Sequence, residues 1–96
     1  MEKSIIEVFT SPTCPHCPSA INLTSQVKEE REDVELHIWS TSTEEGVERA
    51  RQFNVFSVPT IFVRGPGHNE ILAFKGAPSK ERLNKAINIT LGKEKL

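Results

Sequence analysis

The sequence lacks an excess of charge of either sign, and it lacks long apolar runs. Its net charge is −1, so the composition gives no sign of a basic surface for nucleic acid or for an anionic membrane. No apolar run is long enough for the core of a signal peptide or for a membrane span. We therefore expect a single globular domain over residues 1–96, located in the cytoplasm, with no nucleic-acid or membrane partner.

Cysteine is scarce as well, and the placement of the two cysteines is the strongest indication of function in the sequence. The only two cysteines lie in Cys14-Pro15-His16-Cys17, between a predicted strand and a predicted helix. In the cytosol a permanent structural disulfide is unusual, whereas a cycling one is expected. A disulfide across so short a loop would also remove little entropy from the unfolded chain. The pair therefore predicts a redox-active dithiol.

The spacing of apolar residues predicts seven elements in the order β-α-β-α-β-β-α. The predicted strands cover residues 4–10, 34–40, 60–64 and 70–75, and the predicted helices cover 15–31, 42–53 and 79–91. The second helix starts with a capping box of Ser42 and Glu45 and should bury Val47, Ala50 and Phe53. The alternation in 34–40 indicates a half-buried strand near a sheet edge, and residues 65–69 should form a turn. The fold class is α/β, with a four-stranded mixed sheet and helices on both faces.

The order of elements, the Cys-Pro-His-Cys corner and Val58-Pro59-Thr60 at the start of the third strand resemble the thioredoxin superfamily. The resemblance covers about residues 4–91, and the chain is similar to small glutaredoxin-like thioredoxins because it lacks additional N-terminal elements. It implies a minimal thioredoxin fold with Pro59 in the cis form, facing the dithiol, and Val58 offering backbone groups to an extended substrate. Thr60, Gly76 and Ala77 are implied to complete the substrate groove.

The position of each cysteine predicts its role. Exchange begins when a thiolate attacks a disulfide sulfur. Cys14 precedes the helix, where free N–H groups and the positive end of the helix dipole should lower its pKa below the free value of about 8.5. Cys17, one turn inside, should be less exposed and act as the resolving thiol. Pro15 and His16 should tune the pair, since a histidine beside the thiolate stabilises the reduced form and makes the disulfide more oxidising.

Two departures from the family pattern bear on function. Thioredoxins place a buried Asp six residues before the nucleophile, where this sequence has Val8. The adjacent Glu7 should point to the sheet face opposite that of Val8. We therefore expect Glu7 to be a partly exposed sheet residue and not the proton acceptor. Glutaredoxins have Gly-Gly-x-Asp after the last strand, where this sequence has residues 76–79, Gly-Ala-Pro-Ser. A protein disulfide therefore fits better as the substrate than glutathione does.

The predicted function is that of a dithiol–disulfide oxidoreductase that reduces protein disulfides and serves electron transport and redox homeostasis. The Cys-Pro-His-Cys tetrad also resembles that of the periplasmic oxidase DsbA, so an oxidase or isomerase role is the alternative. A metal- or iron–sulfur-binding glutaredoxin-like module and a redox-inert interaction domain are further alternatives. We expect no metal and no cofactor, because one C-x-x-C without a second Cys or His cluster falls short of four ligands. The resemblance suggests a monomer that receives electrons from a thioredoxin-reductase-type donor.

Overall fold

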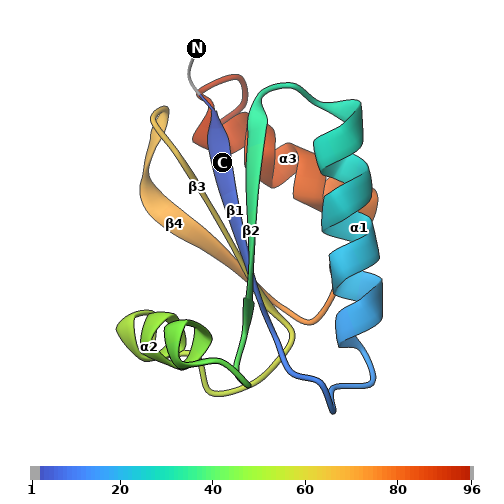
Figure 1. The fold of residues 1–96 in the computed structure, drawn as a ribbon. Coiled ribbons are helices and arrows are strands. Elements are labelled where there is room, and N and C mark those ends of the chain that lie inside the picture. Colours follow the sequence, from blue (N-terminus) through green and yellow to red (C-terminus); the bar gives the residue numbers. More distant parts are fainter. Residues whose placement is uncertain (1–2, 96) are drawn as a thin grey trace.

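The computed structural model describes residues 3–95, so Met1, Glu2 and Leu96 of the expected domain lie outside the described residues. The described chain has the predicted order of strands and helices (Figure 1). Its elements are β1 (Ser4–Thr10), α1 (Cys17–Glu30), β2 (Val34–Ser40), α2 (Glu44–Gln52), β3 (Thr60–Gly65), β4 (His68–Lys75) and α3 (Lys80–Thr90).

The strands form one four-stranded mixed sheet in the order β2-β1-β3-β4. β1 runs parallel to β2 and antiparallel to β3, and β3 pairs antiparallel with β4. The prediction of a mixed sheet is confirmed, and so is the placement of residues 34–40 at a sheet edge. β1 and β3 are the two central strands, with a neighbour on each side.

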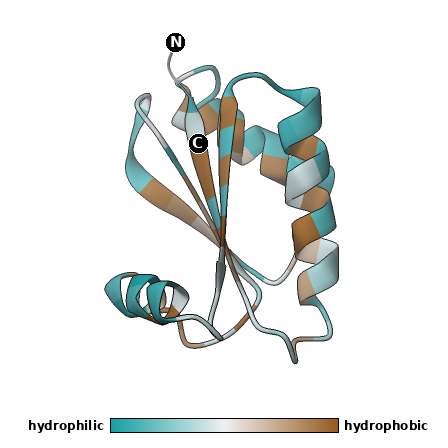
Figure 2. Ribbon diagram, in the orientation of Figure 1, coloured by the Kyte–Doolittle hydropathy of each residue, from teal (hydrophilic) through white to brown (hydrophobic). Residues whose placement is uncertain are grey.

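Helices lie on both faces of the sheet, as predicted (Figure 1). α1 and α3 cover one face, and the main core lies beneath them, where the side chains of β1 and β3 meet the inner faces of both helices. Its fully buried apolar residues are Ile6, Val8, Ala20, Val27, Ile61, Val63, Leu83 and Ile87. On the opposite face, α2 closes over a smaller aromatic cluster in which Phe9 meets Phe53 and Phe62 edge to face. Figure 2 shows α2 as the most hydrophilic of the helices, in keeping with this shallow contact.

The second helix differs from its prediction at both its start and its buried face. Its N-cap is Thr43, whose Oγ1 accepts a hydrogen bond from the Gly46 N–H (N···O 3.0 Å), and not Ser42. Ser42 instead bonds to Ser40, with 2.7 Å between the hydroxyl oxygens. Val47, which the sequence predicts to be buried, is 40% exposed, because α2 faces the sheet with Gly46 and Ala50, its two buried residues.

Two further boundaries differ. α1 begins at Cys17 rather than at residue 15, because the residues from Pro12 to His16 form turns ahead of the helix. The predicted five-residue turn of the hairpin is only two residues long, since Gly65 and His68 still pair as strand residues. The Gly67 N–H donates to the Thr90 carbonyl (N···O 2.7 Å), and this bond holds the turn against the end of α3.

Candidate active site

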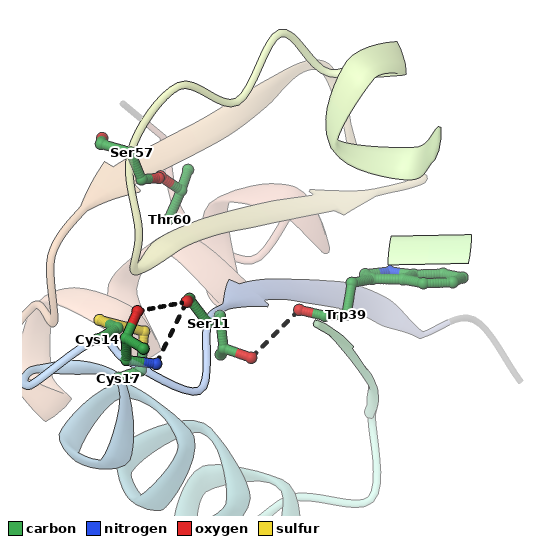
Figure 3. Close-up of a disulfide and its surroundings, with 8 residues drawn as sticks. Ser11, Cys14, Cys17, Trp39, Ser57 and Thr60 are labelled. Carbon is green, nitrogen blue, oxygen red and sulfur yellow. Dashed lines mark hydrogen bonds between the residues drawn. A yellow bond between two sulfur atoms is a disulfide. The ribbon is translucent and has the colours of Figure 1, made fainter. Parts of the chain in front are cut away.

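The two cysteines form a disulfide at the junction between β1 and α1 (Figure 3). Their Cα atoms are 5.4 Å apart, within the normal range for a disulfide. The two residues differ in access: Cys17, the first residue of α1, is 2% exposed, whereas Cys14 is only partly buried. Figure 3 shows Ser11 beside the pair, and its carbonyl accepts a hydrogen bond from the Cys14 N–H (N···O 3.2 Å). An approaching molecule therefore meets Cys14 first.

The start of α1 favours negative charge on a nearby sulfur. His16 is the N-cap residue and is exposed, and its side chain makes no capping hydrogen bond. The first turn of α1 contains no Asp or Glu that would neutralise the positive end of the helix dipole. Pro15 is exposed between Cys14 and His16, and Pro18 occupies the first turn. A helix start with uncompensated amides stabilises a thiolate next to it, which is the chemistry that exchange requires.

A second segment, residues 56–60, leads into β3, the antiparallel neighbour of β1. Phe9 pairs with Thr60, so the chain leaving β1 runs next to the chain entering β3. The Val58–Pro59 peptide bond is cis, as the resemblance implies. Among the hydrogen bonds of residues 3–95, none involves the backbone N–H or C=O of Val58. These two groups are free to pair with an added extended chain.

Gly76 joins the end of β4 to the segment that contains Pro59. Its N–H donates to the Pro59 carbonyl (N···O 2.8 Å), and its φ of +84° lies in the left-handed region that favours glycine. A Cβ at this position would meet nothing within 4 Å, so the backbone angle, and not space, accounts for the glycine. Thr60 is held by a hydrogen bond from its Oγ1 to the Ser57 carbonyl (O···O 2.6 Å), and Ala77 is exposed after Gly76.

Glu7 is the residue whose environment the sequence predicted wrongly. It does point to the sheet face opposite the main core, but it is 1% exposed rather than partly exposed. Arg49 on α2 donates from Nε to Oε1 (2.8 Å) and from Nη2 to Oε2 (3.1 Å), and Trp39 donates from Nε1 to Oε1 (3.1 Å). Arg64 lies 3.6 Å away. The carboxylate is buried because α2 and the large Arg49 and Trp39 side chains cover this face.

Sequence reasoning did not identify two residues near this site, Arg49 and Phe56. The Arg49 guanidinium, whose pKa is raised by the hydrogen bonds to Glu7, also lies over the Phe53 ring at 4.6 Å. Phe53 begins the segment that leads to Pro59, so Arg49 connects the buried carboxylate to that segment. Phe56 is 94% exposed within the same segment. An aromatic residue three positions before Pro59, where no apolar pattern required one, is the signal that could have drawn attention to it.

Residues 3–95 contain neither a membrane-spanning helix nor a cluster of metal ligands. No described helix has the length and apolar character needed to cross a membrane. No group of three or more His, Cys, Asp and Glu side chains in this part of the chain is arranged to hold a metal ion.

Comparison with known proteins agrees with this geometry. The sequence profile of a family described as thioredoxin domain matches residues 4–88. The chain is 38% identical to a thioredoxin of Methanocaldococcus jannaschii over 87 residues, which cover 91% of this chain and 95% of that protein. It is 40% identical to a probable thioredoxin of Methanothermobacter thermautotrophicus over 83 residues, which cover 86% and 91% of the two chains.

Solved structures show the same fold at lower sequence identity. The Fasciola hepatica thioredoxin superposes with a TM-score of 0.75 at 23% identity, over 92% of this chain and 81% of that one. Mitochondrial thioredoxin 3 of Saccharomyces cerevisiae, in its oxidised form, gives a TM-score of 0.72 at 18% identity, over 92% and 79%. These two structures support the arrangement of the sheet and the helices.

Proposed function

Since the chain belongs to the thioredoxin family and is a dithiol–disulfide oxidoreductase, we propose that it works as a reductase of protein disulfides. The observation that carries this proposal is the unequal access of the two sulfurs. Cys14 is within reach of a partner and lies before the dipole of α1, whereas Cys17 is covered. In this arrangement Cys14 attacks and Cys17 resolves.

The reaction balances over two exchanges. The Cys14 thiolate attacks one sulfur of the substrate disulfide, a mixed disulfide forms, and the other substrate sulfur leaves as a thiolate that takes up a proton. The Cys17 thiol then loses its proton and attacks the Cys14 sulfur, which releases the second substrate thiol. The substrate gains two electrons and two protons, and the Cys14–Cys17 disulfide is formed. A donor of two electrons must then restore the dithiol.

The substrate groove is formed by segments that meet beside Cys14. The free N–H and C=O of Val58 would pair with the backbone of an extended substrate segment, as an edge strand does. Pro59, Thr60, Gly76 and Ala77 would form the adjoining wall. This arrangement is supported by the hydrogen bond from the Gly76 N–H to the Pro59 carbonyl, which fixes the segment after β4 against the segment before β3.

Single substitutions at the two cysteines test the assigned roles. With dithiothreitol as reductant, the protein should reduce insulin disulfides, and Cys14→Ser should abolish that turnover. Cys17→Ser should accumulate a mixed disulfide with the substrate, visible by mass spectrometry under non-reducing conditions. Unchanged turnover in Cys14→Ser, or a trapped adduct on Cys17 instead of Cys14, would contradict this assignment.

The position of His16 favours the second candidate function, that of a disulfide oxidase or isomerase. His16 is exposed at the N-cap, where a hydrogen bond or a positive charge would stabilise the Cys14 thiolate and so favour the reduced state. The redox equilibrium with glutathione separates the two directions. A reductase should lie near the thioredoxin value of about −270 mV and an oxidase near −120 mV. His16→Gly should make the dithiol more reducing, and an unaltered potential would remove the tuning role.

The electron donor, the location and the oligomeric state complete the proposal. We propose a flavin-dependent donor of the thioredoxin-reductase type, a monomeric protein and a cytoplasmic location, where glutathione and thioredoxin systems keep thiols cycling. NADPH oxidation coupled to insulin reduction through an added thioredoxin reductase tests the donor. Sedimentation in the reduced and oxidised states tests the monomer, and cell fractionation tests the location.

A further inference from the structure

Phe56 is the most exposed large apolar residue of residues 3–95. Its exposed fraction is 94%, against 40–45% for Ile38, Val47 and Ile71. A phenylalanine fully in water forgoes about 1.5–3 kcal/mol that burial would provide. A single exposed apolar residue needs no explanation, but this one lies in the segment that forms the substrate groove, two positions before Val58. Its location suggests that it is buried when another molecule occupies the site.

Two hollows flank Phe56, and both are lined by Asn54, Val55 and Phe56. The first, of about 340 Å³, lies toward α2, and we call it the α2 hollow. The second, of about 200 Å³, lies toward β3 and β4, and we call it the hairpin hollow. The hairpin hollow is also lined by Thr60, which places it directly beside the groove. Most of the lining of each hollow is apolar, so each can accept an apolar side chain packed against the Phe56 ring.

Among the described residues, the charged side chains that line the two hollows are both positive: Arg51 at the α2 hollow and Lys75 at the hairpin hollow. Lys75 is exposed and takes part in no salt bridge with another described residue, whereas Arg51 has a surface contact to Glu48 at 3.6 Å. The chain as a whole has a net charge of −1, so this concentration of positive charge is local. It favours a partner that has carboxylates next to its apolar residue.

The register of the sheet ties these charges to the reaction centre. Lys75 pairs with Thr60 across β3 and β4, and its neighbour Gly76 bonds to Pro59. A substrate segment paired with the Val58 backbone would therefore lie next to the hairpin hollow, which Phe56 and Lys75 both line. Successive side chains of an extended segment point to opposite sides, so one near the reacting cysteine can enter a hollow.

We propose that Phe56, with the α2 hollow, the hairpin hollow, Arg51 and Lys75, selects protein disulfides whose cysteine is flanked within a few residues by an apolar residue and an acidic residue. This proposal rests on the proposed function, because the selected segment is the substrate of that same reaction. Aromatic residues in contact with hollows of this kind are the side chains that contribute most to binding energy at interfaces, and the flanking charges add selectivity.

The test measures attack by Cys14 alone, in the Cys17→Ser background. The probes are four short peptides, each with one cysteine held as a mixed disulfide with thionitrobenzoate. The cysteine neighbours are Leu and Glu in the first peptide, Leu and Lys in the second, Ser and Glu in the third, and only Gly in the fourth. The Cys14 thiolate attacks the peptide sulfur, the peptide–thionitrobenzoate bond breaks, and thionitrobenzoate leaves with the electron pair as a coloured thiolate. No other oxidant or reductant takes part, and the absorbance gives the rate constant.

The Leu–Glu peptide should react fastest, and Phe56→Ala should slow it about tenfold, the usual loss when an aromatic interface residue is truncated. The rate with a small symmetric disulfide, which does not reach the hollows, should stay unchanged. Lys75→Glu should slow the Leu–Glu peptide about threefold and speed the Leu–Lys peptide, with both effects fading in high salt. Phe56→Ala should fold normally, because so exposed a side chain has few contacts to lose.

Ile71→Ala is the matched control, since it removes a half-exposed apolar residue of β4 that lines neither hollow. Four peptides that react within a factor of two of one another, or an Ile71→Ala effect as large as that of Phe56→Ala, would overturn the proposal. So would Phe56→Ala raising the KM for a thioredoxin reductase with no effect on the peptides, which would assign this surface to the electron donor. The reductase function fails separately, through the measured redox potential, because Cys14 attack on the probes does not depend on the physiological direction.

Discussion

The hydrogen bonds between Glu7 and Arg49 allow a prediction about stability. A second arginine on the same helix, Arg51, provides the control. The Glu7 side chain is 2% exposed, and Arg49 makes two hydrogen bonds to it, of 2.8 and 3.1 Å. Arg49→Met keeps the apolar stem over Phe53 and removes both bonds. Hydrogen bonds to a charged group contribute about 1.5–3 kcal/mol each, and removal of one partner of a buried pair costs about 3–5 kcal/mol.

The lower part of this range is expected. The Arg49 side chain is 27% exposed, so water already weakens the pair, and Trp39 and Arg64 remain beside Glu7 after the change. We expect a loss of about 3 kcal/mol in the free energy of unfolding. For a domain of this size, such a loss corresponds to a fall in Tm of about 12–24 °C.

The assay is urea unfolding followed by far-UV circular dichroism, with all variants in the oxidised state. Arg51→Met on the same helix is the control, because Arg51 makes only a 3.6 Å contact at the surface, and its change should stay within about 0.5 kcal/mol. Glu7→Gln and the double variant complete a cycle whose coupling energy should be about 2 kcal/mol. A loss below 1 kcal/mol in Arg49→Met, or additive effects in the cycle, would refute the reasoning.

Two further predictions concern pH and packing. The Arg31 hydrogen bonds, at 2.9 and 3.0 Å, and then that of Lys93, hold the pKa of Asp33 well below its usual value. A lowered folded pKa means that Asp33 stabilises the fold above the unfolded pKa of about 3.9 and loses that contribution as the pH falls below it. Asp33→Asn should therefore cost about 1 kcal/mol at pH 7 and progressively less below pH 5, and a difference that stays constant down to pH 2.5 would contradict this. Gly46→Ala should cost about 3 kcal/mol in chemical denaturation, because its Cβ would overlap the Ser40 carbonyl and push α2 from β2; a stability within 1 kcal/mol of wild type would be inconsistent with that overlap.

Local patterns were sufficient for much of the fold. The bounds of β1 and β2 follow from their apolar residues, and the helix predicted from residue 79 starts there because the Ser79 hydroxyl caps it by accepting from the Arg82 N–H. Asn54, just after the end of α2, has a φ of +56°, in the left-handed region that asparagine adopts at the ends of helices. Each of these features depends on residues within a few positions of one another, where propensity and hydrogen-bonding chemistry act directly.

The remaining features depend on residues far apart in the sequence. The burial of Glu7 depends on Arg49 and Trp39, which reach it only after β2 and α2 have taken their places. Both Ser42 and Thr43 bond to Ser40, and the choice between them as the cap depends on which hydroxyl the folded loop places against the Gly46 N–H, which a motif does not reveal. The two cysteines, by contrast, could be predicted as a dithiol because their spacing is itself local, whereas the exposure of Phe56 could not be predicted.

The pairing of β1 with β3 has a consequence for the protein while it is being made. Cys14 and Cys17 lie early in the chain, and the segment around Val58 and Pro59 lies well past its middle, so synthesis completes the dithiol long before the groove. Until β3 has emerged and paired with β1, the nascent chain has two reactive thiols and no surface with which to choose a partner. A fragment that ends before Thr60 should thus keep thiols that react with any small disulfide while showing no preference among proteins. Reactivity is encoded in one stretch of sequence, and discrimination is acquired only by folding.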